Sequence, residues 1–165
     1  MPRIVFLLLF VSLLVAGCMS PLTPEPLKTP TSEKPITSNL PASNGEWMIK
    51  MTHSGGIMGL SRSIEISADG KFTVVDKRAN KTMNGELSAV ELSKVRELIS
   101  STKYVAPGKP NSMVCADCFI YDLEVRTDGE KFAAELNDIS LPDSGLEPLI
   151  NYLRNLIDTT LKQNT

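Results

Sequence analysis

Residues 119–136 read FIYDLEVRTDGEKFAAEL, two alternating segments joined by an Asp-Gly pair. In the first segment Phe, Tyr, Leu and Val alternate with mostly polar residues, the pattern of a strand with one face buried and the other in water. Asp128-Gly129 tolerates the positive φ values of a tight turn, so the chain is expected to return as a second strand. The stretch therefore predicts an antiparallel hairpin in a sheet that is covered on one face only.

The same alternation occurs upstream. Residues 47–52 and 63–67 are each expected to form a strand with apolar side chains on one face. Asp69-Gly70 is expected to close a two-residue turn into a strand at 72–75, and Asn84-Gly85 to mark another turn near a short strand. These strands extend the hairpin into a larger antiparallel sheet.

Two segments carry helical signals. Ser88 and Glu91 have the spacing of a capping box, which precedes a stripe of apolar residues at 92–99. A second helix is announced by Asp143-Ser144 and by Pro148, because proline is tolerated in the first turn of a helix. Its apolar stripe has the i, i+3, i+4, i+7 spacing of one helix face: Leu146, Leu149, Ile150, Leu153, Leu156, Ile157 and Leu161.

These elements predict one α+β domain over residues 46–165. Its expected architecture has two layers, a mostly antiparallel sheet with two helices on one face, in the order β-β-β-(β)-α-β-β-α. The full chain of 165 residues carries 17 Lys and Arg against 19 Asp and Glu. This balance gives no sign of a nucleic-acid partner.

The first 17 residues are expected to be a secretory signal peptide. Arg3 is followed by an apolar run to Ala16. The run is shorter than the roughly 20 apolar residues that a membrane-spanning helix needs. The run is therefore interpreted as a targeting signal and not as part of the folded domain.

The end of this run resembles the bacterial lipobox. Residues 14–18 read Leu-Val-Ala-Gly-Cys. The resemblance implies cleavage between Gly17 and Cys18, attachment of diacylglycerol to the Cys18 thiol, and acylation of the new amino group by a fatty acid such as palmitate. The alternative is an ordinary signal peptide that happens to carry a cysteine. With the lipobox, the protein is expected to be an extracytoplasmic lipoprotein, held to a membrane of the cell envelope.

Residues 18–45 are expected to be a disordered tether. The segment is dense in Pro, Ser and Thr, and six prolines at positions 21–41 remove backbone donors and disfavour helix. Too few apolar residues remain to offset the entropy of ordering. The tether would hold the domain away from the bilayer.

Cys115 and Cys118 form the most reactive motif of the domain. A thioredoxin-like dithiol has its first cysteine at a helix N-terminus, where the thiol pKa is lowered, but this pair precedes a strand. A structural disulfide suits an oxidising compartment. Unpaired or metal-linked thiols are a third interpretation, although structural zinc takes four ligands and the domain offers these two cysteines and His53. No metal site and no cofactor are expected.

No catalytic residues are predicted, and the protein is not expected to be an enzyme. His53 is the one histidine of the chain. Neighbouring Ser54 points to the opposite face of a strand, so the two do not make a nucleophile and its base. His53 is interpreted as a surface residue beside a turn. Asp122 and Glu124 share a sheet face, but they are treated as solvated carboxylates.

Residues 54–59 read Ser-Gly-Gly-Ile-Met-Gly. The segment lacks the Gly-Lys-Ser/Thr ending of a phosphate-binding loop. Gly55, Gly56 and Gly59 allow positive φ values. Ile57 and Met58 either tuck into the core or form a contact loop for a partner protein, since exposed apolar loops often mark interaction sites.

Four segments resemble the emfourin family, small proteinaceous inhibitors of thermolysin-like metallopeptidases. The resemblance runs from about Met48 to Leu156. It is carried by Ser54-Gly55-Gly56 with Gly59, Gly85-Glu86-Leu87-Ser88, Asp117-Cys118-Phe119-Ile120-Tyr121-Asp122-Leu123, and Leu141-Pro142 with Leu146 and Pro148-Leu149. The cysteine pair and the lipid tether depart from the family pattern.

The resemblance implies a non-catalytic domain that inhibits a secreted metallopeptidase. The loop of Gly55, Gly56, Ile57, Met58 and Gly59, with Asp117, would occlude the cleft of the peptidase. The alternative is an envelope lipoprotein that binds another envelope protein or a ligand, or has a structural role, without inhibition. An exposed rigid loop favours the inhibitor, and a concave pocket on the open face of the sheet favours the alternative.

Overall fold

The computed structural model describes residues 37–40, 45–106, 115–127 and 129–163. Within these residues, the principal element is a six-stranded antiparallel sheet in the order β5-β4-β3-β2-β7-β8. Its strands are β2 (Trp47–Gly55), β3 (Leu60–Ser67), β4 (Lys71–Asp76), β5 (Lys81–Glu86), β7 (Phe119–Thr127) and β8 (Glu130–Asn137). The predicted signal peptide, Cys18 and most of the predicted tether lie outside the described residues.

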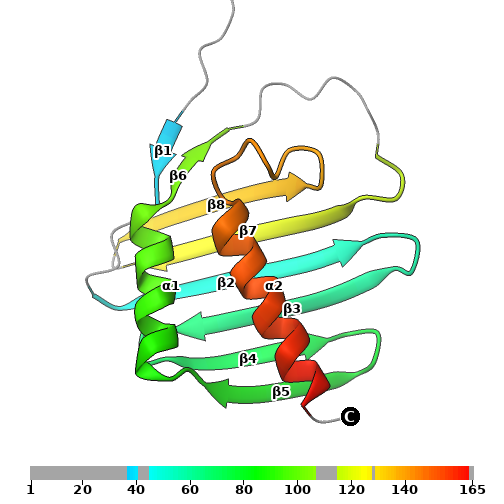
Figure 1. Cartoon of the computed structure of the whole chain (residues 1–165), viewed down its shortest axis with the longest axis horizontal. Helices are drawn as coiled ribbons and strands as arrows, with labels where there is room; N and C mark the ends of the chain where they lie inside the picture. The colour runs from blue at the N-terminus through cyan, green and yellow to red at the C-terminus, as the bar shows by residue number, and fades with distance from the viewer. Residues whose placement is uncertain (1–36, 41–44, 107–114, 128, 164–165) are drawn as a thin grey trace, which may run out of the picture. The chain divides into compact units, whose positions relative to one another are not determined.

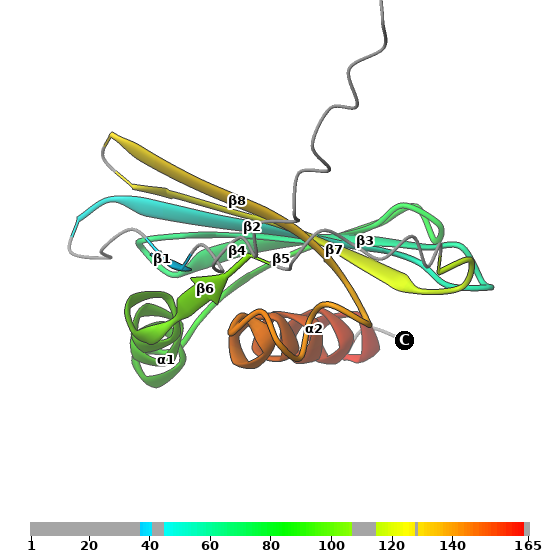
Figure 2. The same ribbon diagram turned by 90° about the horizontal axis from the view of Figure 1, so that it is seen from above.

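Helices α1 (Ala89–Ser101) and α2 (Glu147–Lys162) lie side by side on one face of this sheet (Figures 1 and 2). Neither described helix covers the other face, which is called the open face. The predicted two-layer α+β fold, with both helices on one face of an antiparallel sheet, is therefore confirmed. Neither described helix is long and apolar enough to span a membrane.

The core lies between the sheet and the helices. Alternate residues of the central strands point toward the helices, and most of the apolar ones are buried: Trp47, Ile49, Met51, Ile64, Ile66, Val74, Tyr121, Leu123 and Val125. From α2, Leu149, Ile150, Leu153 and Ile157 are buried against them, whereas Leu156 is half-buried. Burying each of these side chains contributes about 1.5–3 kcal/mol to stability.

Both helix starts are built by the residues that predicted them. In α1, the Glu91 amide donates to the Ser88 hydroxyl at 3.3 Å, and the Ser88 amide donates to the Glu91 carboxylate at 2.8 Å. In α2, Pro148 occupies the first turn. The Ser144 hydroxyl accepts a hydrogen bond from the Leu146 amide at 3.0 Å, which satisfies a donor before the helix begins.

A second, two-stranded sheet was not predicted. It pairs β1 (Thr37–Asn39) with β6 (Lys103–Val105). Because β1 lies in the segment expected to be tether, and Leu40 is buried in the core, the domain begins before residue 46. Strands of three residues are too short to show a periodic pattern. Figure 1 shows β1 at the end of the sheet where β2 begins, opposite the loop that joins β2 to β3.

Two turn predictions were wrong in detail. Three residues, Ala68 to Gly70, join β3 to β4, and of these Gly70 alone has a positive φ, at 87°. The Gly70 amide donates to the Ser67 carbonyl at 2.9 Å, so the connection is one residue longer than the two-residue turn expected at Asp69-Gly70.

Asn84-Gly85 marks no turn, because both residues lie inside β5. The chain reverses earlier, where Asn80 has a φ of 48°. Gly85 lies opposite Phe72, and a Cβ atom at residue 85 would come within 2.3 Å of the Phe72 ring. The glycine makes room for this aromatic ring.

Candidate functional site

The Gly55–Gly59 loop projects its two large side chains into solvent. Ile57 is 84% exposed and Met58 is 69% exposed, so neither is tucked into the core. The backbone of the loop is nevertheless held. The Gly59 amide donates to the Gly56 carbonyl at 2.9 Å, and the Arg78 guanidinium donates to the Met58 carbonyl. The loop therefore exposes two apolar side chains on a backbone that hydrogen bonds hold in place.

The glycines at the base of this loop allow a close approach to the start of β7. The Gly56 amide donates to the Cys118 carbonyl at 3.1 Å. A Cβ atom on Gly55 would lie 2.5 Å from the Cys118 carbonyl oxygen, and one on Gly56 would lie 2.6 Å from the Phe119 ring. Both glycines also have positive φ values. Larger residues would therefore push the loop off β7.

Gly55→Ala is expected to lower the free energy of unfolding by about 2 kcal/mol, because alanine is strained at a φ of 94° and its Cβ would meet Cys118. Gly59→Ala is the matched control, with a φ of 59° and no atom within 4 Å of the added Cβ. We expect it to cost about 1 kcal/mol. Urea denaturation followed by tryptophan fluorescence measures both. Equal effects would contradict the close contact at Gly55.

Cys115 and Cys118 are joined in a disulfide immediately before β7. Both cysteines are half-buried, and Ala116 and Asp117 between them are exposed. The bridge closes a loop of only a few residues, so the chain-entropy estimate of its contribution to stability is small, about 2 kcal/mol. Asp117 lies in this exposed turn, next to the segment that receives the Gly55–Gly59 loop.

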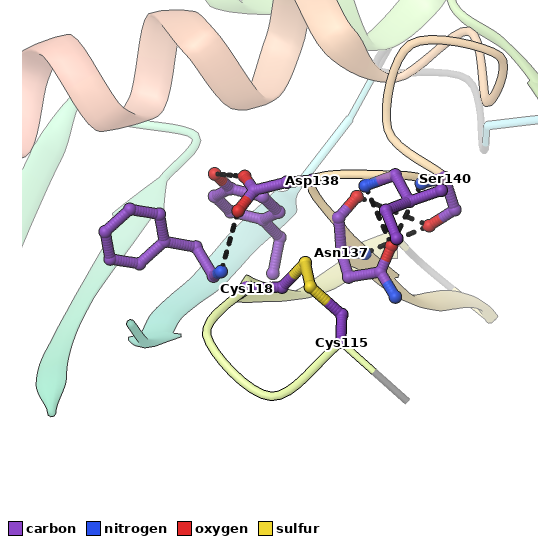
Figure 3. The surroundings of a disulfide bond; sticks show 8 residues. Cys115, Cys118, Asn137, Asp138 and Ser140 are labelled. Carbon is purple, nitrogen blue, oxygen red and sulfur yellow. Dashed lines mark hydrogen bonds between the residues drawn. A yellow bond between two sulfur atoms is a disulfide. The ribbon is translucent and has the colours of Figure 1, made fainter. Parts of the chain in front are cut away.

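Asp138, which follows β8, was not predicted as a site residue. Its carboxylate accepts from the Phe119 amide and from the Tyr121 hydroxyl, each at 2.8 Å (Figure 3). Burial, together with this hydrogen bond, raises the pKa of Tyr121 to about 12. No local signal in the sequence could identify the partners of Asp138, because both lie on another strand.

His53 is buried, so its interpretation as a surface residue was wrong. It is 7% exposed and lies between two aromatic rings, 5.0 Å from the ring centroid of Tyr121 and 4.8 Å from that of Phe119. Its Nε2 atom has no hydrogen-bond partner among the described residues. Burial lowers the pKa of His53 to about 4, and the positive charge of Arg154 acts in the same direction.

The signal for this burial was present in the sequence. His53 continues the inward alternation of Trp47, Ile49 and Met51 along β2. The buried imidazole stacks on the Tyr121 ring and so packs as part of the core. The charged groups near His53 form ion pairs between elements of the fold. Arg62 on β3 pairs with Asp76 at 2.8 Å and with Asp158 of α2 at 2.9 Å.

The open face of the sheet carries ion pairs and a shallow depression. Glu124 pairs with Arg126 and with Lys131, the latter at 2.9 Å, and these partners hold the pKa of Glu124 below its usual value. The depression lies beside Lys50 and Asp122 and is open to solvent. In the part of the chain that the structure describes, no three His, Cys, Asp or Glu side chains gather where they could bind a metal.

Comparisons with known proteins do not assign this site. No protein-family model and no curated protein matches the sequence. The resemblance to emfourins therefore stays a prediction that rests on the motifs quoted above.

Proposed function

We propose that this protein is a membrane-anchored lipoprotein of the cell envelope whose domain binds another protein through the Gly55–Gly59 loop. The proposed target is a thermolysin-like metallopeptidase, inhibited by steric occlusion of its cleft. One observation supports the proposal more than any other: Ile57 and Met58 are exposed on a loop whose backbone is held in place. Adjacent exposed apolar side chains that form a patch often mark a contact surface.

A binding loop that is already ordered lowers the cost of association. A loop that must be ordered on binding loses conformational entropy, and this loss lowers affinity. The Gly55–Gly59 loop is already anchored to Cys118 and braced by Arg78. Binding would therefore bury Ile57 and Met58 without first having to order their backbone.

The proposal needs no chemistry from this domain. His53 is buried, and the two domain cysteines are bonded to each other. Inhibition by contact alone is consistent with both features. The lipids proposed on Cys18 would hold the domain at the membrane surface, and the segment after Cys18 would act as a spacer.

The test measures inhibition of a panel of thermolysin-like peptidases by the full chain carrying Cys18→Ser, kept in detergent micelles. We expect inhibition at micromolar concentration or below. The Ile57→Ser/Met58→Ser variant should weaken it by about thirtyfold or more, the effect of removing an interface hot spot. Val90→Ser is the matched control, because Val90 is 79% exposed on α1, away from the loop.

Val90→Ser should leave inhibition unchanged. If no peptidase of the panel is inhibited at micromolar concentration, the metallopeptidase target is wrong. Loop-dependent binding to another envelope protein would then support the alternative, a lipoprotein that binds a different partner.

A further inference from the structure

Loops from three parts of the chain meet at one end of the sheet. They are the Gly55–Gly59 loop, the Cys115–Cys118 turn and the turn at Asn137–Ser140. Figure 3 shows the last two of these side by side. Two neighbouring backbone groups join them. The Cys118 carbonyl accepts from the Gly56 amide at 3.1 Å, and the Phe119 amide donates to the Asp138 carboxylate at 2.8 Å. The disulfide therefore closes the turn from which both neighbouring loops are held.

Both of these loops expose apolar side chains. Ile139, in the Asn137–Ser140 turn, is 56% exposed, and Ile57 and Met58 are exposed on the other loop. The Asn137 side chain accepts from the amides of Ile139 and Ser140 at 3.0 and 2.9 Å, which fixes the shape of this turn. Ile139 is thus a further exposed apolar side chain at the same end of the sheet as the Gly55–Gly59 loop.

We propose that the Cys115–Cys118 disulfide is a reducible clamp that holds these two loops in place for binding, and that a dithiol reductant opens it. The regulatory part rests on the proposed function, because it assumes that the Gly55–Gly59 loop binds a partner. The reductant is a dithiol, either a small molecule or the active site of a thioredoxin-like protein. The two cysteines are accessible to it, since both are half-buried in an exposed turn.

The reaction is ordinary thiol–disulfide exchange. A thiolate of the reductant attacks one sulfur of the bridge, which breaks the S–S bond and forms a mixed disulfide. The second thiol of the reductant then attacks the mixed disulfide and releases the protein. Two electrons and two protons pass to Cys115 and Cys118, which become thiols, while the reductant becomes a disulfide.

Reduction should act on the loops and not on the core. Without the bridge, residues 115–118 are no longer confined to a turn, so the bonds to Gly56 and Asp138 open more often. The loops then have to be ordered on binding, which lowers affinity. Further along β7, Tyr121, Leu123 and Val125 stay buried between the sheet and the helices, so the fold should persist.

The test is amide hydrogen exchange on the full chain carrying Cys18→Ser in detergent micelles, which leaves Cys115 and Cys118 as the only thiols. Dithiothreitol is the dithiol. Reduction should speed exchange of the Gly56 and Phe119 amides by about tenfold or more. The Gly70 amide, bonded to Ser67 at the other end of β3, is the internal control and should not change. A Cys115→Ser/Cys118→Ser variant should exchange rapidly at Gly56 and Phe119 with or without dithiol.

Unchanged exchange at Gly56 and Phe119 after reduction would overturn the clamp, whatever the protein binds. Loss of protection at Gly70 as well would also overturn it, because the bridge would then support the whole fold. Where the proposed target is inhibited, reduction should weaken inhibition by about tenfold. Faster exchange at both amides without inhibition in either redox state supports the clamp and rejects the metallopeptidase target, so the two proposals fail separately.

Discussion

Leu153→Ala is expected to lower the free energy of unfolding by about 3–4 kcal/mol, the largest effect of any substitution considered for this domain. Leu153 lies in the middle of α2 and is fully buried against the sheet. Truncation removes apolar contacts and leaves a cavity, because both the sheet and the helix backbone are too rigid to close it completely. Urea denaturation followed by the fluorescence of Trp47, the single tryptophan of the chain, measures the change.

Asn155→Ala is the control for Leu153→Ala. Asn155 is exposed on the same helix, so its replacement should alter stability by less than about 0.5 kcal/mol. A loss below about 1 kcal/mol for Leu153→Ala would mean that α2 does not pack on the sheet as described.

Lowering the pH from about 7.5 to 5 is expected to cost the domain about 2 kcal/mol through His53 alone. The pKa of His53 is about 4 in the folded protein and about 6.5 in an unfolded chain. Between about pH 6.5 and 4 the His53 side chain is therefore protonated in the unfolded state but mostly neutral in the folded state. The stability contributed by the neutral imidazole is complete above the unfolded pKa and is lost as the pH falls toward 4, where the loss approaches about 3 kcal/mol.

His53→Phe isolates this effect, because phenylalanine keeps an aromatic ring between Tyr121 and Phe119 and cannot be protonated. The variant should be nearly insensitive to pH between about 7.5 and 5, and at pH 5 it should be more stable than the wild type. Denaturation midpoints at several pH values in this range test the prediction. A parallel pH dependence in the variant and the wild type would assign the loss to other groups.

The long elements could be predicted from the sequence because their signals are local and repeated. Alternation along 119–136 identified β7 and β8, and the Ser88–Glu91 pair placed the start of α1 within one residue. By contrast, β1 and β6 have three residues each, and their pairing depends on contacts between distant segments. Gly85 misled for a related reason: the Asn-Gly pair is a local turn signal, but here the opposite strand carries Phe72 and requires a glycine.

The candidate site divides in the same way. The glycines of the Gly55–Gly59 loop could be identified from their own conformational freedom. Whether Ile57 and Met58 face solvent could not, since that depends on where the neighbouring strands end. The role of Asp138 could not be predicted from the sequence, because its two hydrogen-bond partners, Phe119 and Tyr121, lie on another strand. His53 could have been assigned to the core if the alternation of inward-facing residues along β2 had been extended from Met51 to residue 53.

The short β1–β6 sheet has a mechanical consequence. Any tension on a lipid-anchored chain would reach the domain first at β1, which is held to β6 through only three paired residues. Separating β1 from β6 and withdrawing Leu40 from the core would lengthen the tether by roughly 3.5 Å for each residue released. The Gly55–Gly59 loop lies at the opposite end of the sheet, so the strand that yields first is distant from the proposed contact surface (Figure 1).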